Sequence, residues 1–184
     1  MSQGAKLAPY TQMGIRGNEI CAAVARVQLS KLDGMLEKTR ALKKKLLSCL
    51  DKPVNYKLQH VDDPEGDCGI SMAIVANDSE SAKGLSELMG EQGLGIGSAY
   101  NEQGFPDRHI YKNWEAILQK RSASPAGYPW NDPNYKGGVQ YSPDMCQKSL
   151  DILARCLRFG ININMTEINM EEVAQVINYA DKNL

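Results

Sequence analysis

Residues 16–50 read RGNEICAAVARVQLSKLDGMLEKTRALKKKLLSCL and carry the strongest helical signal in the chain. Their apolar side chains recur at intervals of three and four residues, as at Ile20, Val24, Val27 and Leu46, which is the spacing of one helix face and not of a strand. A continuous helix over this range would be about 50 Å long at about 1.5 Å per residue, longer than a small domain usually needs. Such a helix is long enough to bridge two domains or subunits.

The ends of this predicted helix carry matching signals. Asn18 is suited to be the N-cap, and Glu19 places negative charge in the first turn, where the helix dipole favours it. The lysines at 43–45 place positive charge near the last turn and predict a solvated helix face. Pro53 is expected to end the helix, and Gly34 weakens its middle and favours a bend there.

The length and composition of the chain limit its expected number of domains, its partners and its location. A chain of 184 residues buries a sizeable core, and we expect one domain, with an extended arm at most. Lys and Arg number 21 against 22 Asp and Glu, so the net charge of −1 indicates neither nucleic acid nor an anionic membrane as partner. No apolar run is long enough to span a bilayer, and residues 1–15 lack the apolar core of a signal peptide, so a cytoplasmic protein is expected.

The five cysteines are widely spaced and include no Cys-x-x-Cys pair. This pattern suggests neither a disulfide framework nor a zinc site, and we expect reduced, mostly buried thiols. No Ser/His/Asp, Cys/His or metal-ligating constellation is recognisable either. The sequence therefore does not support catalysis by this chain unaided.

The sequence after Pro53 predicts a small α/β domain. Alternating or continuous apolar residues predict strands at 54–61, 68–76 and 94–100, with a helix from about 80 to 91 between the last two. Farther along the chain, we expect a helix at about 145–157 and a strand at 161–165. A final helix follows, with Asn169 and Glu172 as its capping box. This order predicts helices on one side of a small sheet. It divides the chain into an N-terminal arm (1–15), a long linker helix (16–52) and a small α/β domain (53–184).

Residues 102–141 are the segment in which we expect function to concentrate. Its part at 122–138 mixes turn-forming Pro and Gly with Tyr128, Trp130 and Tyr135, and loops of such length in compact domains tend to be binding loops or lids. The aromatic side chains either line a sugar-binding pocket or simply pin the loop to the domain. His60, which falls in a strand pattern, is expected to have a structural role.

Two blocks of the sequence resemble one enzyme family. Arg16-Gly17-Asn18-Glu19, then Ala22-Ala23, Gln28-Leu29 and Lys31-Leu32-Asp33, resemble a helix of the DegT/DnrJ/StrS family of pyridoxal-phosphate-dependent sugar aminotransferases. The second block runs from His-Ile-Tyr and Trp at 109–114 through Lys-Arg-x-Ala-x-Pro-x-Gly at 120–127 to Tyr-Lys-Gly-x-Val-x-Tyr-Ser-Pro-Asp-Met-Cys at 135–146. It resembles the branch of that family typified by 8-amino-3,8-dideoxy-manno-octulosonate transaminase.

The resemblance implies the small C-terminal domain of a fold-type I aminotransferase, with a mainly antiparallel sheet. It implies pyridoxal 5′-phosphate as cofactor and assigns Arg16 to its phosphate, although Gly14 stands where the family usually has Asn. His109, Tyr111 and Trp114 are assigned to the sugar substrate. The family's cofactor lysine lies upstream of the helix, and Lys6 lacks the serine-rich setting of that lysine.

These observations leave several functions open. The first is the C-terminal half of an aminotransferase acting on a keto or aldehyde sugar, which needs an N-terminal polypeptide that carries the cofactor lysine. The second is a non-catalytic module that binds a sugar or mediates assembly, and the third is an inactive remnant. In the first two, the long helix is the expected contact for a homo- or hetero-oligomer, because its apolar face needs a cover.

Overall fold

The computed structural model describes residues 17–98, 100 and 109–184. Within these ranges the chain divides into two compact units, each described by itself below. The larger unit contains residues 17–98 and 151–184, and the smaller unit contains residues 100 and 109–150. No helix in the described part of the chain is long and apolar enough to cross a membrane.

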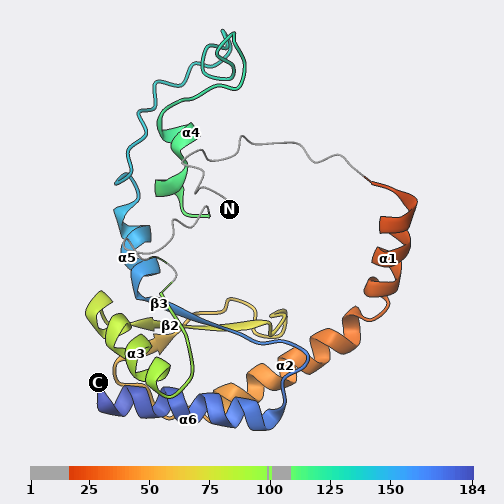
Figure 1. The fold of residues 1–184 in the computed structure, drawn as a ribbon, viewed down its shortest axis with the longest axis vertical. Helices are drawn as coiled ribbons and strands as arrows, with labels where there is room; N and C mark the ends of the chain where they lie inside the picture. The colour runs from red at the N-terminus through yellow and green to blue at the C-terminus, as the bar shows by residue number, and fades with distance from the viewer. Residues whose placement is uncertain (1–16, 99, 101–108) are drawn as a thin grey trace. The chain divides into compact units, whose positions relative to one another are not determined.

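The expected long helix is two helices, α1 (Glu19–Leu29) and α2 (Leu32–Ser48) (Figure 1). The prediction of a continuous helix is therefore wrong, and the break lies at Ser30 rather than at Gly34. The Ser30 hydroxyl donates a hydrogen bond to the Val27 carbonyl at 2.8 Å, and such local side-chain bonding competes with the regular helix ladder.

The start of α1 is as predicted, whereas the end of α2 is not. The Asn18 side chain caps α1, because its Oδ1 accepts a hydrogen bond from the Cys21 N–H at 2.8 Å, and Glu19 lies in the first turn. The end of α2 is different, since the helix stops at Ser48 and not at Pro53. Local turn bonds, including Cys49 N–H to the Leu46 carbonyl at 3.1 Å, end the helix before the proline is reached.

A three-stranded antiparallel sheet lies at the centre of the larger unit, in the order β1-β2-β3. Its strands are β1 (Tyr56–Leu58), β2 (Ser71–Ala76) and β3 (Cys156–Gly160). Leu58, Ile74 and Leu157 are aligned across the sheet. The α/β class and the small antiparallel sheet are as expected.

Two expected strands are not formed as predicted. In the range 94–100, where a strand is predicted, the described residues (94–98 and 100) form one bridge, between Ser98 and Leu157. No strand forms at 161–165, and the last strand, β3, precedes this range. Helix α5 (Gln147–Arg155) passes directly into β3, so Leu157 is part of the sheet and not of the predicted helix. Pairing with β2 outweighs the helical spacing of the local sequence there.

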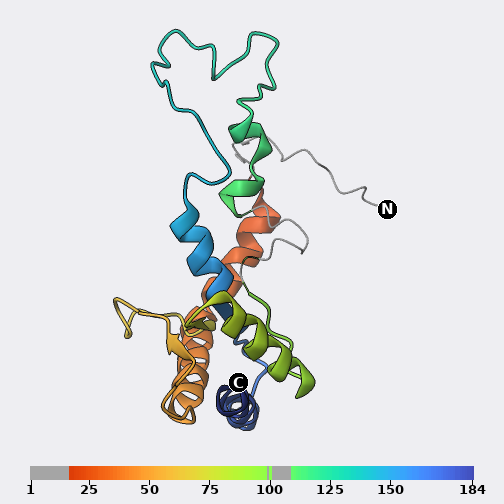
Figure 2. The same cartoon turned by 90° about the vertical axis from the view of Figure 1, so that its left-hand side faces the viewer.

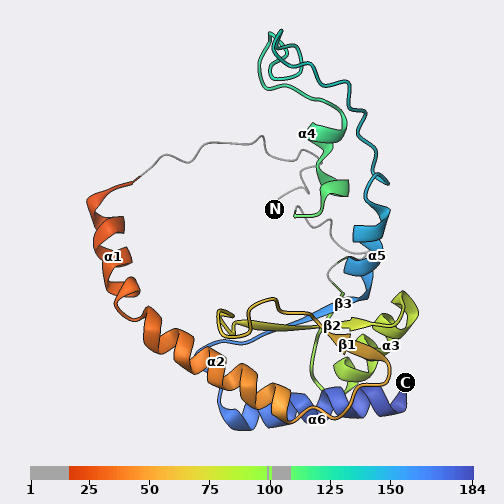
Figure 3. The same ribbon diagram turned by 180° about the vertical axis from the view of Figure 1, so that it is seen from behind.

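Three helices, α2, α3 (Ser79–Glu91) and α6 (Glu167–Asn183), cover one face of this sheet (Figures 1 and 3). The alternate residues Met72, Ile74 and Ala76 of β2 point toward them, as strand geometry requires. The core formed between these helices and the sheet includes Leu42, Leu46, Tyr56, Ile74, Leu85, Met89, Leu157, Met170, Ala174 and Ile177.

The last helix begins earlier than the capping prediction places it. Thr166, and not Asn169, is the N-cap of α6; Asn169 occupies the third helical position and completes a capping box with Thr166. Near the other end, the buried Asp181 carboxylate accepts hydrogen bonds from the Val54 and Asn55 N–H groups at 2.9 and 2.8 Å. These bonds fasten the entry to β1 onto α6.

The smaller unit contains little regular structure. A 3-10 turn, η1 (Tyr111–Asn113), leads into the short helix α4 (Glu115–Leu118). Between α4 and α5 the described chain forms no helix or strand. Figure 2 shows this segment as a long excursion of irregular chain.

Candidate functional site

A groove of about 660 Å³ in the larger unit lies between α2 and the end of β1. The α2 wall consists of Arg40, Lys43, Lys44 and Leu47. These positions are spaced i, i+3, i+4 and i+7 and therefore share one helix face. Lys43 and Lys45 were expected to be solvated, but each makes an ion pair, with Asp67 and Glu171 respectively.

The opposite wall consists of the end of β1 and the β1–β2 loop (residues 59–70). Leu58, Val61 and Pro64 supply apolar surface there, while Glu65 and Asp67 supply carboxylates. Volumes of this size are typical of small-molecule sites, which combine apolar walls with a few polar groups.

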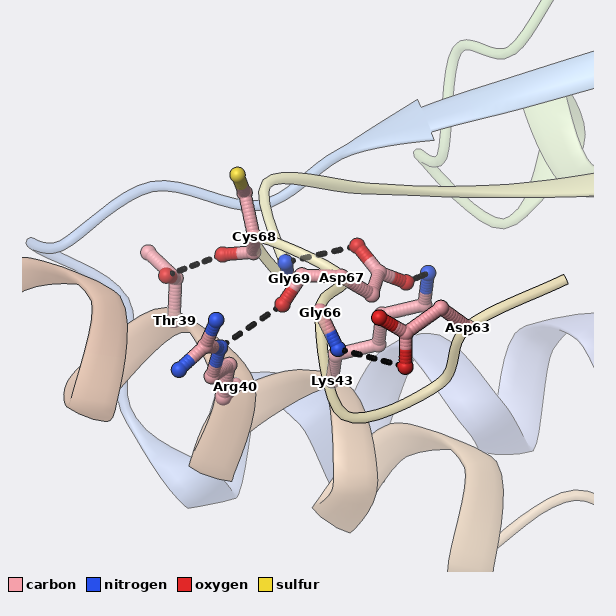
Figure 4. Close-up of polar contacts among 8 residues, drawn as sticks. All are labelled: Thr39, Arg40, Lys43, Asp63, Gly66, Asp67, Cys68 and Gly69. Carbon is pink, nitrogen blue, oxygen red and sulfur yellow. Dashed lines mark hydrogen bonds and ion pairs between the residues drawn. The ribbon is translucent and has the colours of Figure 1, made fainter. Parts of the chain in front are cut away.

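The loop is fixed to α2 by side-chain contacts (Figure 4). The Thr39 hydroxyl donates to the Cys68 carbonyl at 2.7 Å, and the Arg40 Nε donates to the Asp67 carbonyl at 2.7 Å. Gly69 has φ of +69° and lies so close to α2 that an added Cβ would be 2.6 Å from the Thr39 backbone. Only glycine combines that backbone conformation with so close an approach, so the groove has a defined wall.

Asp67 is the main electrostatic link across the groove. Its carboxylate pairs with the Lys43 ammonium group and accepts a hydrogen bond from the Gly69 N–H at 2.8 Å. Both contacts favour the charged form, so the pKa of Asp67 lies below its usual value, with the Lys43 contact as the largest cause.

His60 is predicted to lie in a strand, and this placement is wrong, whereas its structural role stays a prediction. Strand β1 ends at Leu58, so His60 lies in the loop, where its side chain is 85% exposed and its Nε2 is 3.1 Å from Asp62 Oδ1. It contributes to the lining of the groove.

The residues proposed from the family resemblance lie elsewhere. Arg16 is outside the described residues. His109 and Trp114 lie in the smaller unit, on either side of η1, and both are exposed, Trp114 to 43%. Tyr111 has a structural contact: its hydroxyl donates to the Pro143 carbonyl at 2.6 Å and accepts from the Cys146 N–H at 3.1 Å. It thereby ties η1 to the segment before α5.

Two of the three aromatic residues of the long loop contact each other, whereas the third, Tyr128, is 48% exposed. Trp130 packs edge-on against Tyr135 and Tyr141, with ring centroids 5.9 and 6.1 Å apart, and its Nε1 donates to the Arg121 carbonyl at 2.9 Å. The hydroxyl oxygen of Tyr135 is buried, and its interaction with the Tyr141 hydroxyl raises the pKa of Tyr141. For Trp130 and Tyr135, this packing favours the interpretation in which the aromatic side chains hold the loop, and for Tyr128 both interpretations stay open.

The cysteines are unpaired, but they are less buried than expected. Cys21, Cys68 and Cys146 are exposed, while Cys49 and Cys156 are partly buried. Burial raises the pKa of the Cys156 thiol, which lies in β3. In the described ranges, no group of His, Cys, Asp and Glu side chains is arranged to hold a metal ion.

The described residues do not form a site for pyridoxal phosphate. A lysine that binds this cofactor must present its amine in a pocket, beside a carboxylate placed for the ring nitrogen. Of the two lysines that line the groove, Lys43 is held by Asp67, and Lys44 is exposed on α2.

In comparisons with known proteins, no family model matches this chain, and no curated protein matches it significantly. The groove itself was not predicted from the sequence. Arg40 and Lys44 belong to an ordinary amphipathic helix pattern, and residues 62–66 (DDPEG) are an acidic turn signal between the predicted strands at 54–61 and 68–76. The available signal was Gly69 shortly after the acidic turn, because a glycine next to a strand often marks a close backbone approach.

Proposed function

We propose that this chain is the C-terminal part of a pyridoxal-phosphate-dependent sugar aminotransferase and that an N-terminal partner supplies the cofactor lysine. The reaction would transfer an amino group from an amino acid such as glutamate to a keto or aldehyde sugar. The proposal rests on the two sequence blocks at 16–33 and 109–146. A cytoplasmic location belongs to the same proposal.

The structural observation that supports binding of a partner chain is the exposure of α1. None of its residues is buried, and Ile20 and Val24 are 78% and 56% exposed. Ile20, Val24 and Val27 lie on one side of the helix, at spacings of four and three residues. An apolar stripe of this kind is typical of a surface that another protein covers. In the family that the sequence resembles, this helix leads out of the cofactor domain.

Within this proposal, His109 and Trp114 belong to the sugar side, since both are exposed. An exposed indole presents a flat apolar surface, which suits stacking on a sugar ring. Tyr111 would position this part of the site and not contact the sugar, because its hydroxyl bonds hold η1 against residues 143–146. The alternative is a non-catalytic assembly module. It would use the same exposed helix α1 as its contact surface, but His109 and Trp114 would then bind no sugar substrate.

The direct test is reconstitution with the polypeptide encoded beside this chain. We expect that polypeptide to carry the Asp and Lys of the cofactor domain, and the mixture to show the visible absorbance of bound pyridoxal phosphate and sugar-dependent amino transfer. Trp114→Ala should raise KM for the sugar without preventing assembly. A neighbouring frame without those residues, or a complex without transfer, would contradict the enzymatic proposal.

Matched charge variants test the contact through α1. Val24→Glu places a carboxylate on the apolar stripe, whereas Ala22→Glu places one on the other side of the same exposed helix. We expect Val24→Glu to weaken assembly by about tenfold or more, because a buried unpaired charge is costly, and Ala22→Glu to leave it nearly unchanged. Sedimentation velocity of the mixture measures both. Equal effects of the two variants would exclude α1 as the contact.

A further inference from the structure

We propose that the groove between α2 and the β1–β2 loop binds a small amphipathic anion, with a carboxylate or phosphate group against Arg40 and Lys44 and an apolar body over Leu47 and Leu58. This inference does not depend on the aminotransferase proposal. It follows from the charges, the apolar surface and the fixed shape of the groove.

The positive charge of the groove is only partly neutralised by the protein. Three cationic side chains from α2 line it, against the carboxylates of Glu65 and Asp67. Asp67 is already paired with Lys43. Arg40 uses only its Nε, which leaves its terminal nitrogens without a hydrogen bond to any residue that the structure describes.

Lys44 is the second available cation. It is exposed, lines the groove and forms no ion pair with another described residue. Arg40 and Lys44 are four residues apart on one helix and therefore lie one above the other on the same face. A guanidinium group and an ammonium group at this spacing present several N–H donors to one anionic group, an arrangement that suits carboxylate or phosphate.

The apolar part of the groove explains why the ligand should be more than a bare anion. Leu47 and Leu58 are 37% and 43% exposed although they line a concave surface, and Val61 and Pro64 extend the same lining. Covering these side chains removes apolar surface from water, which favours a ligand with a hydrocarbon or aromatic body.

The wall that completes the groove is held in place before any ligand arrives. The hydrogen bonds of Thr39 to Cys68 and of Arg40 to Asp67 fix the loop against α2, and Gly69 permits their close contact (Figure 4). A fixed site binds with a smaller loss of conformational entropy than a mobile one.

Three probes test the inference on the whole chain by NMR titration or calorimetry. These are 4-phenylbutyrate, the neutral 4-phenyl-1-butanol, and inorganic phosphate. We expect 4-phenylbutyrate to bind about tenfold more tightly than the alcohol, because only the acid meets the cations, and more tightly than phosphate, which lacks the apolar body. Equal binding of acid and alcohol, tighter binding of phosphate, or no binding would overturn the inference.

Variants then locate the site. Lys44→Gln removes a cation that makes no contact the fold needs, and we expect it to weaken 4-phenylbutyrate binding about fivefold. Arg40→Gln should weaken binding further. Lys38→Gln, on an exposed part of α2 outside the groove, is the matched control. If Lys38→Gln weakens binding as much as Lys44→Gln, the anion is attracted by the general charge of the helix and the proposed site is wrong.

Discussion

Helices α1 and α2 follow each other along the chain, but only α2 has apolar side chains that the described fold buries. In α2, Leu42 and Leu46 are buried against α6 and the sheet, with Leu46 fully inaccessible. In α1, no residue is buried. Both helices have amphipathic spacing, so spacing alone indicates that a helix has an apolar face and not that the same chain covers it.

The two helices are therefore expected to have different parts in the protein. Helix α2 forms the core on one side and one wall of the groove on the other, through Arg40 and Leu47. Helix α1 contributes no buried side chain to the described fold. Most helical stability in proteins comes from tertiary packing, so α1 should gain most of its stability from a partner.

The largest expected difference between the two helices is the loss of stability when an apolar side chain is truncated. Leu46→Ala removes a fully buried side chain and should lower the free energy of unfolding by about 2–5 kcal/mol. Val24→Ala should change it by less than about 0.5 kcal/mol, because the side chain is already in solvent. Urea unfolding followed by circular dichroism measures both in the isolated chain. A comparable loss for Val24→Ala would show that α1 is packed in solution.

The contact between α2 and the β1–β2 loop gives the next largest effect. Gly69→Ala should lower the free energy of unfolding by about 1–3 kcal/mol, because a Cβ there meets the α2 backbone at positive φ. Gly34→Ala, within α2 itself, is the control. Nothing lies within 4 Å of its added Cβ, so it should raise stability by up to about 1 kcal/mol through helix propensity. Thermal unfolding compares the pair, and a neutral Gly69→Ala would mean that the loop is not fixed to α2.

Strong local signals in the sequence were sufficient to predict several elements. The Asn18 cap, the helix ending near Glu91 and the strand ending at Ala76 all follow from nearby residues. In each case a cap, a turn signal or a regular apolar spacing lies within the element itself.

The errors arise where distant contacts outweigh local preference. Residues 156 and 157 continue a helical pattern, yet they pair with β2 in the sheet. The groove was missed for the same reason, because its walls are far apart in the sequence and meet only through Thr39, Arg40 and Gly69.

The smallest expected effect is a pH dependence of stability. It should arise from the contact between α2 and the β1–β2 loop, and α1 has no corresponding contact. The pKa of Asp67 is lowered in the folded protein, chiefly by Lys43. A lowered carboxylate pKa stabilises the fold above the unfolded value of about 4 and loses this effect as the pH falls through the folded value. Acidification below about pH 4 should therefore weaken the contact between α2 and the loop.

Lys43→Gln tests this link, because it removes the largest cause of the shift while keeping the length of the side chain. We expect the variant to lose less stability than the wild-type protein between about pH 4 and pH 2, by under about 1 kcal/mol, since solvent screens this pair. Urea unfolding at a series of pH values measures the difference, and Lys38→Gln controls for the loss of one positive charge from α2. If Lys43→Gln and Lys38→Gln give the same acid profile, the pairing of Lys43 with Asp67 does not hold the loop. The groove wall would then depend on the Thr39 and Arg40 hydrogen bonds and on Gly69 alone.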